Sequence, residues 1–79
     1  MSRLYKRIYY ECEMYWQPIL MEAAGSRAFK VEIVTPFLAE DRMAQRAIAE
    51  ILGDLTVYFV QPDVPIENPR RLRMLVSWK

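Results

Sequence analysis

Residues 4–17 read LYKRIYYECEMYWQ, and the conformation of this stretch decides the architecture expected for the whole chain. With a period of two, the stretch separates into a mostly apolar face and a face that mixes tyrosine with charge. The apolar face holds Leu4, Lys6, Ile8, Tyr10, Cys12, Met14 and Trp16, and the other holds Tyr5, Arg7, Tyr9, Glu11, Glu13, Tyr15 and Gln17. Such alternation in an aromatic and β-branched segment is typical of a β-strand.

We therefore predict a strand that Pro18 interrupts, since proline has no amide proton for a ladder. Its buried side is predicted to consist of Tyr10, Cys12, Met14 and Trp16. A helix is the alternative for the same stretch. An apolar residue also recurs at every fourth position, in the series Leu4, Ile8, Cys12 and Trp16. The longer alternation, which Lys6 alone clearly interrupts on the apolar side, favours the strand.

A second strand is predicted over residues 28–35, where apolar and charged residues alternate again. Its apolar side holds Phe29, Val31 and Ile33. Gly25 and Ser26 precede it and predict a turn. Because consecutive strands with a short link usually pair antiparallel, we expect the first two strands to form a hairpin.

A helix is predicted over residues 38–52, because apolar residues recur there at spacings of three and four and draw one stripe. The stripe consists of Ala44, Ala47, Ile48, Ile51 and Leu52. Thr35 is a suitable N-cap with Pro36 as the first helical residue, and a start nearer Leu38 is the alternative. Gly53 is predicted to cap the C-terminal end of the helix.

Two more strands are predicted after the helix. Residues 55–60 are rich in β-forming residues on both faces, which is typical of a central strand. Three prolines within residues 61–70 predict a stiff, extended loop. Residues 72–78 alternate, with Leu72, Met74, Val76 and Trp78 inward and a basic outer side. The predicted order is β-β-α-β-β, an α+β fold in which one helix packs on one face of an antiparallel sheet, within a single domain of residues 1–79.

The composition excludes most catalytic and metal-dependent functions. The 79 residues contain no histidine, one cysteine and two widely separated glycines. The commonest general base, a zinc-binding ligand set and a glycine-rich phosphate loop are therefore all missing. Glu11 and Glu13 are the remaining catalytic option, and we expect them to face cations across the sheet instead. We predict a non-enzymatic protein with no catalytic residues, no metal site and no cofactor.

The sequence also predicts a cytoplasmic protein. No apolar run approaches the roughly 18 residues that a membrane helix needs, and the N-terminal residues lack the apolar stretch of a signal peptide. A small secreted domain normally carries several disulfides, whereas Cys12 is the single cysteine here. We expect Cys12 to be a small buried hydrophobic residue.

Tyrosine and arginine are among the side chains most enriched at binding hot spots. The predicted partner-binding residues are Tyr5, Arg7, Tyr9 and Tyr15 of the first strand and Arg71 and Arg73 of the last, on the open sheet face. The expected partner is another protein or a nucleoprotein complex. Two alternatives use the same surface. One is a small RNA- or DNA-binding domain, in which aromatic rings stack on bases and cations neutralise phosphates; the other is a homo-oligomer in which the aromatic residues of the copies pair.

The size and predicted element order resemble small phage-encoded inhibitors of host machinery, anti-CRISPR proteins among them. The resemblance is carried by residues 5–16, 29–35, 38–52, 55–60 and 72–78. No sequence motif matches, so no functional residues carry over. The resemblance implies a protein of the host cytoplasm that blocks a partner by occluding its surface.

Overall fold

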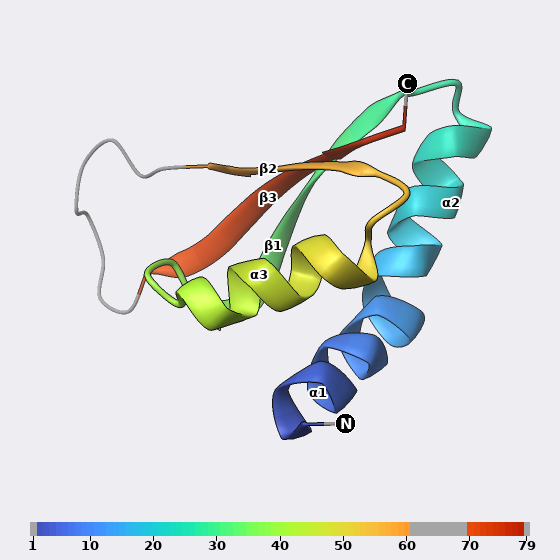
Figure 1. Cartoon of the computed structure of the whole chain (residues 1–79). Coiled ribbons are helices and arrows are strands. Elements are labelled where there is room, and N and C mark those ends of the chain that lie inside the picture. Colours follow the sequence, from blue (N-terminus) through green and yellow to red (C-terminus); the bar gives the residue numbers. More distant parts are fainter. Residues whose placement is uncertain (1, 61–69, 79) are drawn as a thin grey trace.

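The computed structural model describes residues 2–60 and 70–78 and shows a small α+β domain with helices and three antiparallel strands (Figure 1). In chain order its elements are α1 (Arg3–Glu11), the π-helical turn η1 (Cys12–Trp16), α2 (Gln17–Gly25), β1 (Lys30–Leu38), α3 (Arg42–Ile51), β2 (Thr56–Val60) and β3 (Arg71–Ser77). The first three elements are continuous, and together they form the N-terminal arm, residues 3–25.

The predicted first strand is wrong, and with it the order β-β-α-β-β, because residues 4–17 lie within this helical arm. The series with four-residue spacing determines burial: Ile8, Cys12 and Trp16 are buried. Tyr10 and Met14, which the alternation assigned to the core, are instead 54% and 55% exposed. The helical alternative is therefore correct, because a stripe of this spacing can face the core only when the chain coils.

The π-helical turn explains how a strict four-residue spacing stays on one side of the arm. In an α-helix of 3.6 residues per turn, each four-residue step overshoots a full turn by about 40°. A π-helix bonds each residue to the fifth one along and is wider, so η1 reduces this drift between Cys12 and Trp16. Pro18 follows immediately, and its ring would clash with the Met14 carbonyl in a regular α-helix. The wide turn contains Met14 and accommodates the proline.

The predicted hairpin at Gly25 is also wrong, because this residue ends α2. The amide of Ala28 donates to the carbonyl of Ala23 at 3.0 Å, and the amide of Arg27 donates to that of Ala24 at 3.1 Å. These two bonds form a Schellman motif, which places a left-handed residue after the helix. Arg27 is that residue, with φ of 66°.

The second predicted strand exists as β1, but it continues past Thr35 and Pro36 to Leu38. β1 lies at an edge of the sheet, where proline is tolerated, and its register with β3 shifts between Val34 and Leu38. Thr35 is fully buried, and its hydroxyl accepts a hydrogen bond from the Phe37 amide at 3.2 Å. Thr35 is therefore part of the strand and does not cap the helix.

The predicted helix is confirmed as α3, with its apolar stripe facing the core, but it begins at Arg42 and not near Leu38, which still belongs to β1. Its N-cap is Asp41, whose carboxylate accepts a hydrogen bond from the Ala44 amide at 3.0 Å. At the other end Leu52 occupies the capping position, and Gly53 follows it without a positive φ. The prediction that Gly53 caps the helix is therefore wrong, because Gly53 does not adopt the left-handed conformation of a glycine cap.

The sheet order is β1-β3-β2, with both neighbouring pairs antiparallel. The last predicted strand is confirmed as β3 and occupies the centre of the sheet. The strand predicted to be central, β2, lies at the edge of the sheet that residues 2–60 and 70–78 form, because β3 inserts between it and β1. The predicted loop falls mostly on residues 61–69, outside the described part of the chain.

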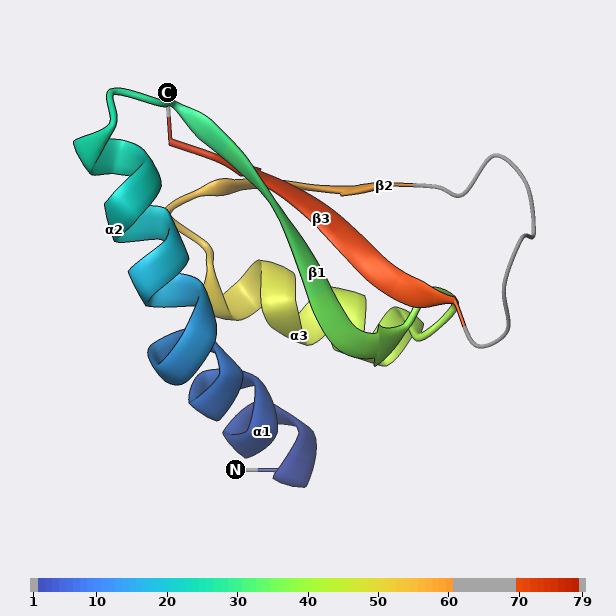
Figure 2. The same ribbon diagram turned by 180° about the vertical axis from the view of Figure 1, so that it is seen from behind.

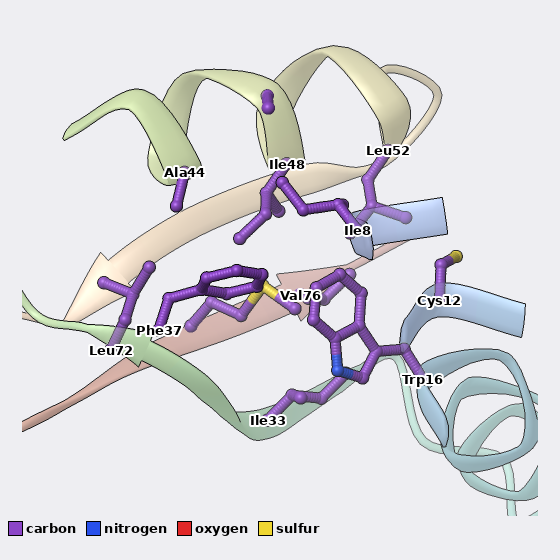
Figure 3. Close-up of a cluster of buried hydrophobic side chains, with 12 residues drawn as sticks. Ile8, Cys12, Trp16, Ile33, Phe37, Ala44, Ile48, Leu52, Leu72 and Val76 are labelled. Carbon is purple, nitrogen blue, oxygen red and sulfur yellow. The ribbon is translucent and has the colours of Figure 1, made fainter. Parts of the chain in front are cut away.

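The core lies between the arm, α3 and one face of the sheet (Figure 3). Its buried side chains are Ile8, Cys12, Trp16, Ile33, Phe37, Ala44, Ala47, Ile48, Leu52, Leu72, Met74 and Val76. The strand residues that alternate with these core residues point to the other face of the sheet, where they are exposed or half-buried. We call this second face, seen with α3 behind it in Figure 2, the open sheet face.

Candidate functional site

The six residues predicted to bind a partner do not form one surface. Tyr5, Arg7, Tyr9 and Tyr15 belong to the arm, and Arg71 and Arg73 belong to β3. The two arginines are exposed on the open sheet face as predicted. The four arm residues lie elsewhere because their segment is a helix and contributes no strand to the sheet.

Tyr5 makes a contact inside the fold. Its hydroxyl donates a hydrogen bond to the Oε2 atom of Glu50 on α3, and its ring is half-buried against the core. This hydrogen bond, with burial as the second cause, raises the pKa of Tyr5 above its ordinary value. Tyr5 therefore joins α1 to α3.

Arg7 is also occupied within the fold. Its guanidinium carbon lies 5.5 Å from the centroid of the Phe37 ring on β1. This distance is typical of a cation–π contact. Because Phe37 is a core residue, the Arg7 side chain covers one border of the core.

The arm nevertheless exposes a group of large apolar and aromatic side chains, 39 to 73% accessible to solvent. They are Tyr9, Tyr10, Met14, Tyr15, Ile19 and Met21, and we call them the arm surface. Tyr9 and Tyr15 were predicted as binding residues. Tyr10 and Met14 were missed because the period-two interpretation placed them in the core, and the four-residue stripe was the signal that could have found them.

The centre of the arm surface is a pair of tyrosine rings. The centroids of Tyr10 and Tyr15 lie 6.3 Å apart with an interplanar angle of 73°, an edge-to-face arrangement. Residues five apart do not face each other in an α-helix. The π-helical turn brings them to one side, so the same turn that keeps Trp16 in the core builds this exposed pair.

The charge around the arm surface changes along the arm. Residues 8–26 contain no lysine or arginine and three glutamates, Glu11, Glu13 and Glu22. Glu13 and Glu22 are exposed, and Glu11 is half-buried. Toward the N-terminus, exposed Lys6 lies within one helical turn of Tyr9 and Tyr10. The arm surface is therefore apolar and aromatic, with glutamates beside its C-terminal part and a cation at its N-terminal end.

The open sheet face differs in charge. Lys30 on β1 and Arg71 and Arg73 on β3 supply cations, and among the described strand residues Glu32 is the one exposed acid of this face. On the central strand, Arg73 pairs with the apolar residues Val34 on one side and Val60 on the other. Tyr58 is exposed on β2 and lies opposite Leu75. This face presents one aromatic ring near a basic strand.

Cys12 is buried among apolar side chains, as predicted. Burial, with the nearby Glu13 as the second cause, raises the pKa of its thiol above the ordinary value. The nucleophilic thiolate is therefore disfavoured. Within residues 2–60 and 70–78 the cysteine and the acidic residues form no group of three or more that could hold a metal ion.

No helix in the described ranges is long and apolar enough to cross a membrane. Comparisons with protein-family models, with curated proteins and with solved structures find no match to this chain. A functional proposal therefore depends on the surfaces described above.

Proposed function

We propose that the chain is a non-enzymatic protein-binding module that acts by covering its partner's surface through the arm surface. The observation that carries this proposal is the exposed Tyr10–Tyr15 pair beside Met14 on a rigid helix. Tyrosine supplies a large apolar ring with a polar tip, which suits it to interfaces. Methionine adapts its shape to different partners. Exposed apolar patches on a protein surface mark sites of interaction.

The chemistry of the arm surface favours one class of partner, a protein with a basic rim around an apolar patch. Glu11 and Glu13, which lie between the two tyrosines in the chain, oppose binding of nucleic-acid phosphates at this surface. Rings and methionines would form the dry centre of the interface, and Glu13 and Glu22 would pair with cations at its border.

The test is affinity capture from lysates with three tagged chains. These are the wild type, the double variant Tyr10→Ala/Tyr15→Ala, and the control Tyr58→Ala, which also removes an exposed tyrosine but from the sheet. Circular dichroism first establishes that all three are folded. We expect a partner that the wild type and Tyr58→Ala retain and that the double variant loses by at least about tenfold, as for hot-spot residues. Equal capture by the double variant would contradict the proposal.

A second candidate function, RNA or DNA binding, is favoured by the open sheet face. Arg71, Arg73 and Lys30 surround a face that also exposes Tyr58, and aromatic rings on basic sheets stack on bases. A titration at low salt with single-stranded oligonucleotides tests it, with Arg71→Ala/Arg73→Ala as the variant. Binding that weakens as salt rises and in the variant supports this function. An absence of binding at low salt excludes it.

The narrower form of the main proposal is an inhibitor of the anti-CRISPR type, which blocks a host protein or nucleoprotein complex. That resemblance was carried by size and by an element order that begins with two strands. The structure begins with a helix, so the narrower form retains only its size and stays a prediction.

A further inference from the structure

The sequence of β2 is that of an interior strand, yet β2 is an edge. Residues 55–60 read LTVYFV and contain no charged residue, no proline and no glycine. Apolar and β-branched residues on both faces are typical of a strand with neighbours on both sides. Within the described part of the chain, β2 pairs with β3 alone. Its outer edge therefore presents backbone donors and acceptors to which no described strand is paired.

The opposite edge of the same sheet is protected. β1 contains Pro36, a register shift before Leu38, and the charged residues Lys30 and Glu32 on its exposed side. Proline, irregular register and charge are the devices by which edge strands avoid pairing with other chains. Residues Thr56–Val60 contain no proline and no charge, and their register with β3 has no shift. The β1 edge of the sheet is therefore protected against pairing with another strand, whereas the β2 edge is not.

We propose that β2 is the dimerisation edge of this protein, where a second copy of the chain adds its own β2 antiparallel and continues the sheet to six strands. A two-fold axis through Tyr58 places this residue opposite its counterpart. It also places Thr56 opposite Val60 on the open sheet face and Val57 opposite Phe59 on the core side. The Thr56–Val60 and Val57–Phe59 pairings each occur twice and the Tyr58 pairing once, as an isologous interface requires.

A second copy suits this edge because the strand complements itself. β-branched residues opposite aromatic ones are favourable cross-strand pairs, and the strand places no like charges opposite each other. The two backbones would exchange about four to six hydrogen bonds, depending on which residues point outward. Val57 and Phe59 are only half-buried at the border of the core, and the neighbouring copy would cover them. The edge is separate from the arm surface, so the dimer does not depend on the proposed function.

The first test compares one lysine placed on each edge. Tyr58 and Val34 are 61% and 53% exposed on the same face, on β2 and β1 respectively. Both Tyr58→Lys and Val34→Lys should therefore fold, which circular dichroism checks. By light scattering, the wild type and Val34→Lys should show twice the 9.4 kDa mass of one chain, and Tyr58→Lys should show that mass once. A monomeric wild type at every concentration, or a dimeric Tyr58→Lys, would overturn the proposal.

A second test uses single cysteines and does not depend on disrupting the interface. In the proposed register, residue 58 meets its counterpart at a distance that a disulfide can span. Under mild oxidation, Tyr58→Cys should form a disulfide-linked dimer at least about tenfold faster than Val34→Cys. Both variants also contain the buried Cys12, so any disulfide formed by this residue contributes equally to the two rates. Equal rates for the two variants would overturn the proposed register.

Discussion

Of the two parts of the N-terminal arm, the more highly charged one contributes more buried residues to the core than the more apolar one. Residues 3–16 carry five charges in fourteen positions, and residues 17–25 carry one in nine. Yet the charged part buries Ile8, Cys12 and Trp16, and none of the residues Gln17–Gly25 is buried. Burial therefore follows the spacing of apolar residues toward the core and not their total number. In α2 Leu20 packs partly against the core, and Ile19 and Met21 stay exposed.

The largest expected effect is the loss of Trp16, the anchor of the charged part. Trp16→Ala removes a ring that is 1% exposed at the centre of the core and should cost about 3–5 kcal/mol of unfolding free energy. Ile19→Ala, three residues later in α2, should cost less than about 1 kcal/mol. Urea unfolding followed by circular dichroism measures both. If the two variants lost similar amounts of unfolding free energy, the two parts of the arm would not differ in their contribution to stability.

Cys12→Ser tests the same buried stripe with a smaller change. The serine hydroxyl would replace a thiol among apolar side chains, and burial of an unpaired hydroxyl costs about 1–3 kcal/mol. Cys12→Ala is the matched control, because it removes the sulfur without adding a polar group. Urea midpoints should rank the wild type first, the alanine variant second and the serine variant last. A serine variant as stable as the alanine one would show that the hydroxyl has found a partner.

In α2 the expected effects have the opposite sign. Arg27 adopts the left-handed conformation after the helix with φ of 66°, which costs a residue with a side chain about 1–2 kcal/mol. Arg27→Gly removes this strain and adds some freedom to the unfolded chain, so we expect a net gain of about 1 kcal/mol. Thermal unfolding measures the change. A lower melting temperature would indicate that the Arg27 side chain makes a stabilising contact.

Gly25 lies two residues earlier, and here the opposite substitution should stabilise. Its φ is not positive, and an added Cβ atom would meet nothing within 4 Å. Gly25→Ala should therefore gain about 0.5 kcal/mol through a less flexible unfolded chain. The measurement is hydrogen exchange, in which the α2 amides of the variant should exchange more slowly, relative to the α1 amides, than in the wild type. Unchanged exchange in α2 would contradict this expectation.

The smallest expected effect concerns the contact between α1 and α3 at high pH. The pKa of Tyr5 is raised above 10.0 in the folded chain, mainly by its hydrogen bond to Glu50. A raised pKa means that the folded state holds this proton more tightly, so the contribution is complete below pH 10 and is lost as the pH rises through the folded value. The difference in stability between the wild type and Tyr5→Phe should shrink over that range. A constant difference up to pH 12 or so would exclude the linkage.

Where a segment has a single hydrophobic period, either helical or strand-like, the sequence predicted the correct type of secondary structure. The stripe from Ala44 to Leu52 has no competing alternation, and α3 forms where it was expected. Ile33 of β1 and Met74 of β3 face inward as predicted, whereas Phe29 lies before β1 and is 49% exposed, and Trp78 lies after β3 and is half-buried. Residues 4–17 satisfy both the strand period and the helical one, and local information could not choose between them. For this reason Tyr5 and Arg7 were predicted on a sheet face, whereas both lie on α1.

The sequence by itself determined the absence of histidine chemistry, the place of Cys12 in the core and the amphipathic elements that follow the arm. The tertiary structure decided the conformation of residues 4–17 and the order of the strands. Both decisions depend on contacts between distant residues: Trp16 packs in one core with Ile33 and Met74, and β3 inserts between β1 and β2. Periodicity describes which face of a segment is apolar, but it does not say which neighbour covers that face.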